Sequence, residues 1–515
     1  MHAGLERDGL KFGADDPEGR HTVRFRAIAC VPGDGNAAWL GFRGLRDADG
    51  APVSGIARTV DAGRTWRIVF AETDRHSDPR MAVSYIEGRA PDSYPNVWFD
   101  DPTTLAASAD GRRCTAGDLF RVYGTRDGGG SWRSYHSRRT GDDLWRTGGI
   151  DLTNCYGVHF DPFDPRHLYF SYTDMGLQQS WDGGLSFQGA TRGMPNTWRN
   201  TTYWLALDPE VEGLVWAACS AAHDLPRPRM FRNRDTDTFE GGVCNSTDGG
   251  RTWQVTSDGL PPMACTHILL DPAGGPAGAR TLWACGFGRG VFRSTDDGRT
   301  WAAVNAGIAG DKPLCRRLTR DPKGALYLVV ARRSEKGEIG DERDGALYRL
   351  EPGADAWQRL ALPEDTNGPN DLQVDPTAPD HLYLAMWGRY RPEGDIGGGV
   401  FMSTDRGTTW TRIFDGDQHV YSTTVDPSTP NIIYAAGFES SVYRSADRGA
   451  TWGRLRGFTF KSAYRVIPDP MRPDRIFVTT FGGSVWHGPA GGDPAAVEDI
   501  ITPLPGKRAG PLPAR

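Results

Sequence analysis

The sequence is poor in lysine and has no cysteine cluster. Only six of its 59 basic residues are lysines, and 65 acidic residues leave a net charge of −6. This balance argues against the basic surface with which proteins bind nucleic acid or anionic membranes. The eight cysteines include no C-x-x-C pair, which argues against zinc clusters and dithiol redox motifs. We therefore expect no nucleic-acid partner and no cysteine-based cofactor.

Long hydrophobic runs are also missing. The chain has no run of about 18 apolar residues, and its start, MHAGLERDGL, lacks the hydrophobic region of a signal peptide. We expect a soluble chain without a membrane partner. The compartment stays open: secreted or periplasmic if a signal peptide was removed before Met1, and cytoplasmic otherwise. The oligomeric state is not indicated.

Glycine and repetition are what the sequence has in quantity. Its 66 glycines and 10% aromatic residues favour β structure with many turns. The octet [ST]-x-D-x-G-x-[TS]-[WF] occurs seven times, beginning at Thr59, Thr125, Ser180, Ser246, Ser294, Ser403 and Ser445, and Trp357 marks a degenerate eighth copy. The spacing of roughly 45 to 65 residues is that of propeller blades.

A second element precedes nearly every octet. It consists of an apolar run, an Asp-Pro turn and an alternating run, as in LQVDPTAPDHLYLAMW. Each repeat then reads as four antiparallel strands, A to D, with the octet between C and D. The first two A strands are weaker, and we place them at Phe25–Val31 and Thr104–Ala109. The last repeat, from Tyr464 to His487, has no octet.

These repeats predict an all-β fold, a single large propeller of eight to nine four-stranded blades. We assign residues 21–487 to the propeller, 1–20 to an N-terminal segment that supplies a ring-closing strand, and 488–515 to a Pro/Gly/Ala-rich tail.

The octets themselves are predicted to be tight hairpins. The aspartate accepts hydrogen bonds from turn amides, the glycine allows a positive φ, and the tryptophan packs under the turn. Asp296 and Asp297 are therefore not catalytic candidates. No octet has the ligand spacing of an EF-type calcium loop. We expect no cofactor; the one weak indication of structural calcium is NRDTDT, with Asp235 and Asp237, which lacks the required glycine and distal glutamate.

The octets resemble the Asp-box (BNR) repeats of sialidases, xyloglucanases, sortilin-type receptors and a photosystem II assembly factor. The resemblance covers nearly the whole chain and implies the propeller fold, but those families differ in function. Together with the Asp-Pro strands, the octets are most similar to xyloglucanase-type and bacterial BNR glycosidase-like proteins. A sialidase should show its arginine motif near the start. The nearest match, Tyr464–Pro468, lies at the other end and in register with the repeats, so we interpret it as a strand.

The candidate ligand site lies in the D-to-A and B-to-C connections, which gather on one face of a propeller. These connections are long, polar and rich in aromatic residues that can stack on sugar rings. The predicted substrate-binding residues are Trp145, Tyr156, Trp198, Arg199, Asn200, His223, Asn370, Trp387, Arg389, Tyr464 and Arg465. The predicted partner is therefore a carbohydrate.

Three functions remain open on this face. A glycoside hydrolase needs two carboxyls, for which Asp151, Asp417 and Glu439 are the candidates, with His419 beside them. A uronate lyase would instead use His or Tyr as base and Arg to neutralise the acid, drawn from His159, His223, His419, Tyr464 and Arg465. The third alternative is a non-catalytic binding or assembly propeller. The sugar, linkage and stereochemistry are not indicated.

Overall fold

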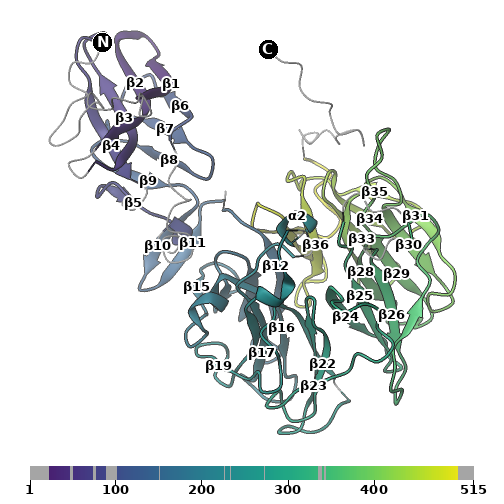
Figure 1. Cartoon of the computed structure of the whole chain (residues 1–515). Coiled ribbons are helices and arrows are strands. Elements are labelled where there is room, and N and C mark those ends of the chain that lie inside the picture. Colours follow the sequence, from purple (N-terminus) through teal and green to yellow (C-terminus); the bar gives the residue numbers. More distant parts are fainter. Residues whose placement is uncertain are drawn as a thin grey trace. The chain divides into compact units, whose positions relative to one another are not determined.

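The computed structural model describes residues 23–496, apart from 47–49, 74–76, 88–100, 150, 226, 232, 272, 335–338 and 341–343. Almost all regular structure in these residues is β (Figure 1). The chain divides into two compact units, Met1–Leu152 and Thr153–Arg515.

The first unit contains two sheets and a hairpin. The first sheet pairs β1 (Arg24–Val31), β2 (Asp34–Arg46), β3 (Pro52–Thr59) and β4 (Arg67–Thr73) in order. The second pairs β6 (Thr104–Ala107), β7 (Cys114–Gly117), β8 (Val122–Thr125) and β9 (Trp132–Ser134), with β5 (Met81–Ala82) parallel to β9. The hairpin consists of β10 (Ser137–Gly141) and β11 (Leu144–Thr147).

Aromatic packing and a buried ion-pair cluster hold the first unit together. Trp132 packs against Trp39 and Phe70, at ring-centroid distances of 6.3 and 5.1 Å. Arg121 is fully buried and forms ion pairs with Glu72 and, at 2.6 Å, with Asp118. Removing one partner of such a cluster leaves an uncompensated buried charge.

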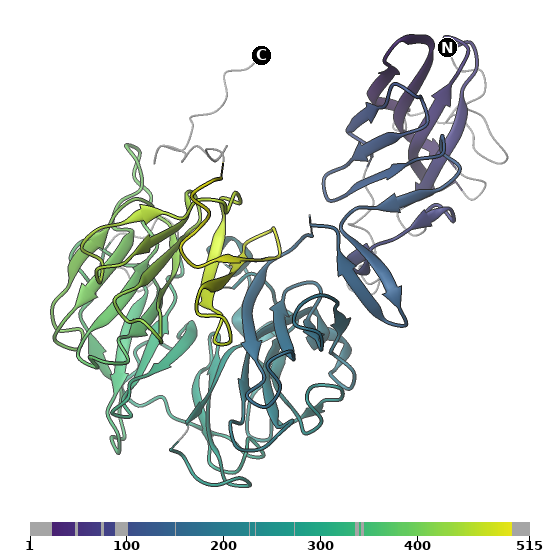
Figure 2. The ribbon, with the colours of Figure 1, turned by 180° about the vertical axis from the view of Figure 1, so that it is seen from behind.

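The second unit contains seven antiparallel sheets in chain order, each built from consecutive strands (Figure 2). Their strands are β12 (Cys155–Phe160), β13 (Leu168–Tyr172), β14 (Leu177–Ser180), β15 (Gln188–Gly189); β16 (Thr201–Leu207), β17 (Val215–Ser220), β18 (Gly241–Ser246), β19 (Gln254–Val255); β20 (Cys265–Asp271), β21 (Thr281–Gly286), β22 (Gly290–Ser294), β23 (Ala302–Ala303); β24 (Cys315–Arg320), β25 (Leu326–Val330), β26 (Ala346–Leu350), β27 (Gln358–Leu360); β28 (Pro369–Val374), β29 (Leu382–Met386), β30 (Gly399–Ser403), β31 (Thr411–Phe414); β32 (Val420–Val425), β33 (Ile433–Gly437), β34 (Ser441–Ser445), β35 (Gly453–Arg454); and β36 (Ala463–Pro468), β37 (Arg475–Thr480), β38 (Val485–Pro489). Short helical turns occur at η1 (Asn196–Asn200), α2 (Pro228–Phe231) and η2 (Thr236–Thr238).

The seven sheets close into a ring. Each first strand contacts the first strand of the next sheet, and the last of them, β36, contacts β12 (Figure 1, yellow beside blue). The closure is fixed by hydrogen bonds from Ser484 N to the Thr153 carbonyl, 3.0 Å, and between the hydroxyls of Ser484 and Tyr172, 2.7 Å. The second unit is therefore a seven-bladed propeller.

The predicted all-β propeller of four-stranded blades is confirmed, and its nine repeats correspond to nine of the ten sheets in the described chain, the tenth being the β10–β11 hairpin. We expected one ring over residues 21–487. These residues instead span both units, with two of the nine sheets in the first unit and seven in the second. The boundary after Leu152 lies within a polar connection whose composition does not differ from its neighbours. The predicted strand in residues 1–20 lies outside the described residues, as does the tail from residue 497, whereas β38 extends to Pro489.

The octets form the C-to-D hairpins. In the copy at Ser294, Oδ1 of Asp296 accepts hydrogen bonds from the Ser294 hydroxyl (2.7 Å) and the Thr300 amide (2.9 Å). Asp297 and Gly298 have φ values of 62° and 83°, so the turn needs two successive left-handed residues. The indole of Trp301 donates to the carbonyl of Thr256, 2.9 Å away on the preceding blade. The octet thus fastens both its own hairpin and its neighbour.

Each inner strand of the second unit has a β-bulge at the same place. The bulged residues are Tyr156, Tyr203, Thr266, Arg316, Asn370, Tyr421 and Tyr464, all buried. Neighbouring ones meet, as where the Tyr156 and Tyr203 rings stack at 4.8 Å, and others meet across the ring, as where Arg316 donates to the Tyr464 hydroxyl at 3.1 Å. The bulges therefore turn one side chain per blade into the centre of the propeller.

The next residues along the inner strands fill the centre further. The Arg317 and Arg465 guanidiniums both pair with Asp371, at 2.9 and 3.0 Å, and both lie over the ring of Trp204. Burial lowers the pKa of Arg317 to about 9 because it disfavours the charged form. The central channel is plugged at these two levels, so ligand access is confined to the loops.

The cysteines of the described chain are all free, and Cys265 and Cys315 are both buried. Burial raises the pKa of the Cys265 thiol to about 12, so the thiolate needed for reaction is disfavoured. Within the described residues, no helix has the length and apolarity to cross a membrane.

Candidate functional site

The D-to-A and B-to-C connections of the second unit surround two hollows that share Ala331. The larger is a groove of about 790 Å³, lined in part by Lys312, Arg333, Asp344 and Tyr348. The smaller is a pit of about 30 Å³ at the top of the plugged channel. Of these two hollows, the groove has the size typical of a ligand site.

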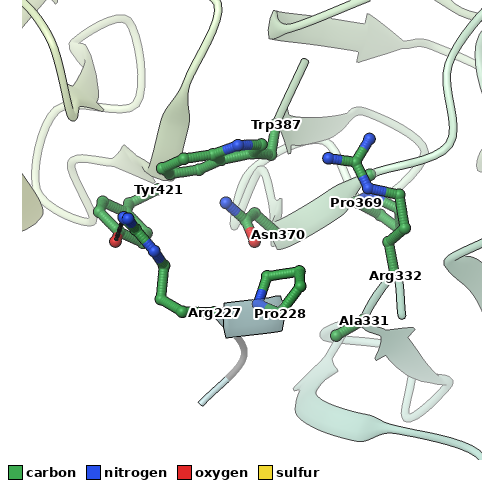
Figure 3. A pocket seen from close by; sticks show the side chains of 9 residues that line it. Arg227, Pro228, Ala331, Arg332, Pro369, Asn370, Trp387 and Tyr421 are labelled. Carbon is green, nitrogen blue, oxygen red and sulfur yellow. Dashed lines mark hydrogen bonds between the residues drawn. The ribbon is translucent and has the colours of Figure 1, made fainter. Parts of the chain in front are cut away.

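The pit is lined mainly by cationic, amide and aromatic side chains. They are Arg227, Arg332, Asn370, Trp387 and Tyr421, together with Pro228, Ala331, Gly368 and Pro369. In Figure 3 Asn370 lies between the two arginines, and Arg227 reaches the Tyr421 hydroxyl. That hydrogen bond, from Nη1, is 2.6 Å long.

The other polar groups of the pit are held by the fold. Asn370 accepts from Arg316 and donates from Nδ2 to the Val420 carbonyl, 3.0 Å away. Arg332 donates to Asn367 Oδ1 at 2.6 Å and to the Gly388 carbonyl at 3.1 Å. These contacts fix the pit before any ligand binds, since each side chain has its orientation set by a neighbouring connection.

A cluster of titratable groups lies beside the pit. His419, just before β32, has Nε2 2.7 Å from Asp395 Oδ2 and Nδ1 3.8 Å from Glu439 Oε1. Lys461 Nζ lies 3.3 Å from the other Glu439 oxygen. The side chain of Glu439 is 28% exposed, whereas the side chains of Asp395 and His419 are 11% and 16% exposed. Glu439 is thus the group most open to a ligand.

The cluster holds its members in charged forms. His419 lowers the pKa of Glu439, against the opposing effect of burial, and Lys461 lowers it further. Burial lowers the pKa of His419, but the neighbouring Asp395 and Glu439 outweigh it, so the net pKa is raised. The ionised carboxylate and the protonated imidazole therefore stabilise each other.

Asp417 lies under this cluster and is almost completely enclosed. Its carboxylate accepts from the His419 amide (2.7 Å), the Glu439 and Ser440 amides (2.9 Å each) and the Ser440 hydroxyl (2.7 Å). Burial raises the pKa of Asp417, and the four donors oppose that rise by stabilising the carboxylate. Asp417 joins the His419 and Glu439 connections.

Trp387 links the pit to the cluster. Its ring stacks on His419 at a centroid distance of 4.5 Å and meets Tyr421 at 4.9 Å. The Arg227 guanidinium lies 5.1 Å from the same ring. Groove, pit and titratable cluster are therefore contiguous, joined by Ala331 and Trp387.

A second carboxylate network joins the start of β12 to the connection that follows β17. Asp224 accepts from the Asn154 amide and from the Tyr156 hydroxyl at 3.2 Å, and its other oxygen lies 3.3 Å from His223 Nδ1. Burial lowers the pKa of His223, but Asp224 outweighs it, so the net pKa is raised.

The remaining predicted site residues lie elsewhere. Asp151 and Trp145 belong to the first unit, where Trp145 packs against Tyr85 at 5.7 Å. Burial raises the pKa of Asp151 to about 6. Trp198, Arg199 and Asn200 belong to η1, between β15 and β16, and Arg389 pairs with Asp365 at 3.6 Å.

Three predicted residues face the filled centre of the propeller. Tyr464 and Arg465 belong to its two plugging levels. His159 is bonded to Ser171 at 2.8 Å, and burial lowers its pKa to about 3. Because the side chains are buried, they maintain the scaffold on which the loops stand.

Sequence reasoning missed Arg227, Arg332, Asp395 and Lys461. All four lie in D-to-A or B-to-C connections, so the repeat pattern selects their segments without selecting the residues. The pairing of Asp395 with His419 joins residues 24 positions apart, which no local motif encodes.

The oxygen-bearing run near Asn233 is engaged by cations of the chain itself. Lys312 Nζ lies 2.6 Å from Asp235 and 3.0 Å from Asp237, which also pairs with Arg289 at 3.1 Å. In the part of the chain that the structure describes, no three potential ligand side chains gather into a metal-binding group.

Two curated proteins are similar to this chain in sequence. A xyloglucanase of a Paenibacillus species is 26% identical over 336 residues, which cover 58% of this chain and 30% of that protein. A probable oligoxyloglucan-reducing end-specific xyloglucanase of Neosartorya fischeri is 29% identical over 194 residues, covering 32% of this chain and 23% of that protein. The chain thus spans less than a third of the length of either relative. No protein-family model matches it.

Solved structures share only general features with this chain. YCF48 from Cyanidioschyzon merolae aligns with a TM-score of 0.46 and 15% identity, covering 65% of this chain and 95% of YCF48. At this level of similarity the comparison carries no argument about function.

Proposed function

We propose that this protein is a glycoside hydrolase acting on an oligo- or polysaccharide, with the reaction centred on Glu439 and His419 of the second unit. The observation that carries the proposal is the Asp395–His419–Glu439 cluster, in which two carboxyls flank one imidazole beside Trp387. The adjoining groove of about 790 Å³ is large enough for sugar rings.

The cluster suits the two halves of glycoside cleavage. Ionised Glu439 takes the proton of the attacking water, whose oxygen bonds to the anomeric carbon as the glycosidic C–O bond breaks. The Asp395–His419 pair returns a proton to the leaving oxygen, so the products are two hydroxyl-bearing sugars. Trp387, which is partly exposed, offers a face for stacking against a ring.

The other candidate carboxyls take different roles in this proposal. Asp417 is a positioning residue, because its oxygens are occupied by four donors from the chain. Asp151 has the raised pKa of a proton donor but belongs to the first unit, so we assign it no step. Its substitution is nevertheless a necessary arm of the test.

The relatives support a glycan as substrate. Both carry names that refer to xyloglucan, so xyloglucan oligosaccharides belong in the panel of glycans to be tested. Because the chain matches only part of each relative, the activity rests on the residues of the loop face, and not on the names.

The test is a panel of plant, algal and microbial polysaccharides with single substitutions. Glu439→Gln and His419→Gln should reduce turnover by about two to four orders of magnitude, since each removes a proton-transfer group. Asp417→Asn should lower kcat, because the carboxylate of Asp417 joins the His419 and Glu439 connections. Asp151→Asn should have little effect. Wild-type rates in both Glu439→Gln and His419→Gln would remove the proposal.

A uronate lyase is the second candidate, favoured by the arginine-lined pit next to His419. In that case neutral His419, the form present above its raised pKa, would abstract a proton beside a sugar carboxylate, and the C–O bond would break by elimination. The product would be an unsaturated uronate with strong ultraviolet absorbance. Hydrolysis gives no such product, so the same assay separates the two reactions.

A further inference from the structure

Arg227 is a partly buried cation without a counter-ion. Its Nη1 donates to the Tyr421 hydroxyl, while its Nε is buried with no hydrogen-bond partner. Among the described residues no carboxylate lies within ion-pair distance of this guanidinium, whereas most enclosed arginines of the propeller, such as Arg280 and Arg465, have one. A guanidinium has five donors, so Arg227 lacks acceptors.

Aromatic rings enclose this guanidinium. Its central carbon lies 5.1 Å from the Trp387 ring, 4.6 Å from Phe438 and 5.0 Å from Phe481. Ring faces attract a cation but do not accept the in-plane N–H bonds of a guanidinium. The nearby carboxylate of Asp224 is already engaged by Asn154, Tyr156 and His223. The environment therefore favours an anion supplied from outside the chain.

The pit limits what that anion can be. Its volume of about 30 Å³ exceeds the ~10–15 Å³ needed for one water and is far below that of a sugar ring. It can admit a small group, such as a carboxylate, while the remainder of the ligand stays outside. Arg227, Arg332 and Asn370 are its polar side chains, together with the Tyr421 hydroxyl, and no carboxylate lines it.

We propose that the pit binds the carboxylate of an acidic sugar whose ring lies outside it, toward the adjoining groove. The planar carboxylate matches the planar guanidinium better than a neutral hydroxymethyl group does. This inference rests on the proposed hydrolase and specifies its substrate class: uronate-containing glycans. Arg227 supplies the charge recognition, and Trp387 lies between the bound carboxylate and His419.

Calorimetric titration of the full chain tests the assignment. The ligands are trimers of galacturonate and of glucuronate, the same trimers as methyl esters, and a sulfated neutral trimer. We expect one of the acid trimers to bind at least about tenfold more tightly than its ester, because the ester lacks the charge-assisted hydrogen bonds. Equal affinity for acid and ester, no binding of either acid, or equal binding of the sulfated trimer would overturn the proposal.

Matched variants localise the effect. Arg227→Gln should weaken acid-trimer binding at least about tenfold and leave ester binding unchanged. Arg229→Gln removes the same charge from an exposed arginine in α2 and should bind as the wild type does. If Arg227→Gln does not fold, Arg227→Lys keeps the charge without the planar fork and should still show weakened binding. Wild-type affinity in a folded Arg227 variant would contradict the inference.

One further variant separates this inference from the proposed reaction. Glu439→Gln should retain Arg227-dependent binding of the acid trimer while turnover is lost. Arg227-dependent binding without hydrolysis of any acidic glycan would support the pit and overturn the hydrolase. Hydrolysis of neutral glycans with no preference for acidic ones would overturn the pit assignment and leave the hydrolase standing.

Discussion

At the scale of single residues, the balance between Glu439 and His419 determines the expected pH dependence. The pKa of Glu439 is lowered and that of His419 is raised, so both are charged over a wider pH range than the free side chains. The reactive form has an ionised Glu439 and a protonated His419.

Turnover should therefore follow a bell-shaped pH profile. We expect the acid limb below the ordinary glutamate pKa of about 4.3 and the alkaline limb above the ordinary histidine pKa of about 6.5. Steady-state kcat/KM measured from acid to alkaline pH checks this. Lys461→Gln should move the acid limb upward, because Lys461 helps to lower the pKa of Glu439. An acid limb that stays in place would contradict this account of Glu439.

Gly157 shows how one residue supports the channel plug. A Cβ at this position would lie 2.8 Å from the Trp204 ring and 2.9 Å from His159 Nε2. Gly157→Ala should destabilise the protein by about 1–3 kcal/mol, since the plug has no room to adjust. Gly453→Ala is the control, because its added Cβ meets nothing within 4 Å. Urea unfolding of both variants gives the comparison, and equal stabilities would contradict the plugged channel.

Residue roles were only partly accessible from the sequence. The repeats excluded Asp296 and Asp297 from catalysis, and the structure shows why, since Asp296 is bonded within its own turn. They also selected His419 and Glu439, which the fold brings together. Asp395 and Arg227 were not selected, because their partners are distant in sequence and nothing local distinguishes them.

At the scale of elements, the C-to-D hairpin is the repeated unit of stability. Burial raises the pKa of Asp296, but hydrogen bonds from Thr300 and Ser294 outweigh it, so the net pKa is lowered. The indole of Trp301 reaches the preceding blade. Each octet thus contributes both turn bonds and inter-blade packing.

Truncation of the two residues should separate these contributions. Asp296→Ala should cost about 1–2 kcal/mol from lost turn hydrogen bonds, and Trp301→Ala about 3–5 kcal/mol from lost packing. The Asp296 contribution should be present above the unfolded aspartate pKa and be lost as pH falls through the lower folded value. Urea unfolding at neutral and acid pH tests both statements. A pH-independent difference between wild type and Asp296→Ala would contradict the second.

Elements were the scale at which the sequence was most informative. The A strand of the first repeat was expected at Phe25–Val31, and the observed strand, β1, begins one residue earlier. The A strand of the second repeat was expected at Thr104–Ala109, and the observed strand, β6, ends at Ala107. Alternation and turn chemistry are local signals, so they locate strands well. The β-bulge of every inner strand of the second unit was not expected, because the repeats show where strands lie but not how seven of them meet at the ring centre.

At the scale of the whole molecule, two compact units follow one another in a chain of uniform repeats. Repeat spacing gave the number of sheets but not their division between units, because closure depends on contacts between β12 and β36, over 300 residues apart. The first unit has its own buried ion-pair cluster around Arg121.

That cluster predicts that the stability of the first unit depends strongly on Arg121. Arg121→Ala should destabilise it by about 3–5 kcal/mol, because Glu72 and Asp118 would be left buried without a counter-ion. Arg113→Ala, which removes an exposed arginine 3.9 Å from Asp110, should change stability by less than about 0.5 kcal/mol. Hydrogen exchange of the β6–β9 sheet distinguishes the variants. Equal protection would show that the cluster does not stabilise this unit.

The central claim is hydrolysis of a glycan at the Glu439–His419 cluster, and cleavage in H₂¹⁸O tests it most directly. Mass spectrometry of the products should show one ¹⁸O at each newly released reducing end with the wild-type protein and no product with Glu439→Gln. Products that carry an unsaturated uronate and no ¹⁸O would contradict the account. Equal incorporation of ¹⁸O by the wild type and by Glu439→Gln would also contradict it.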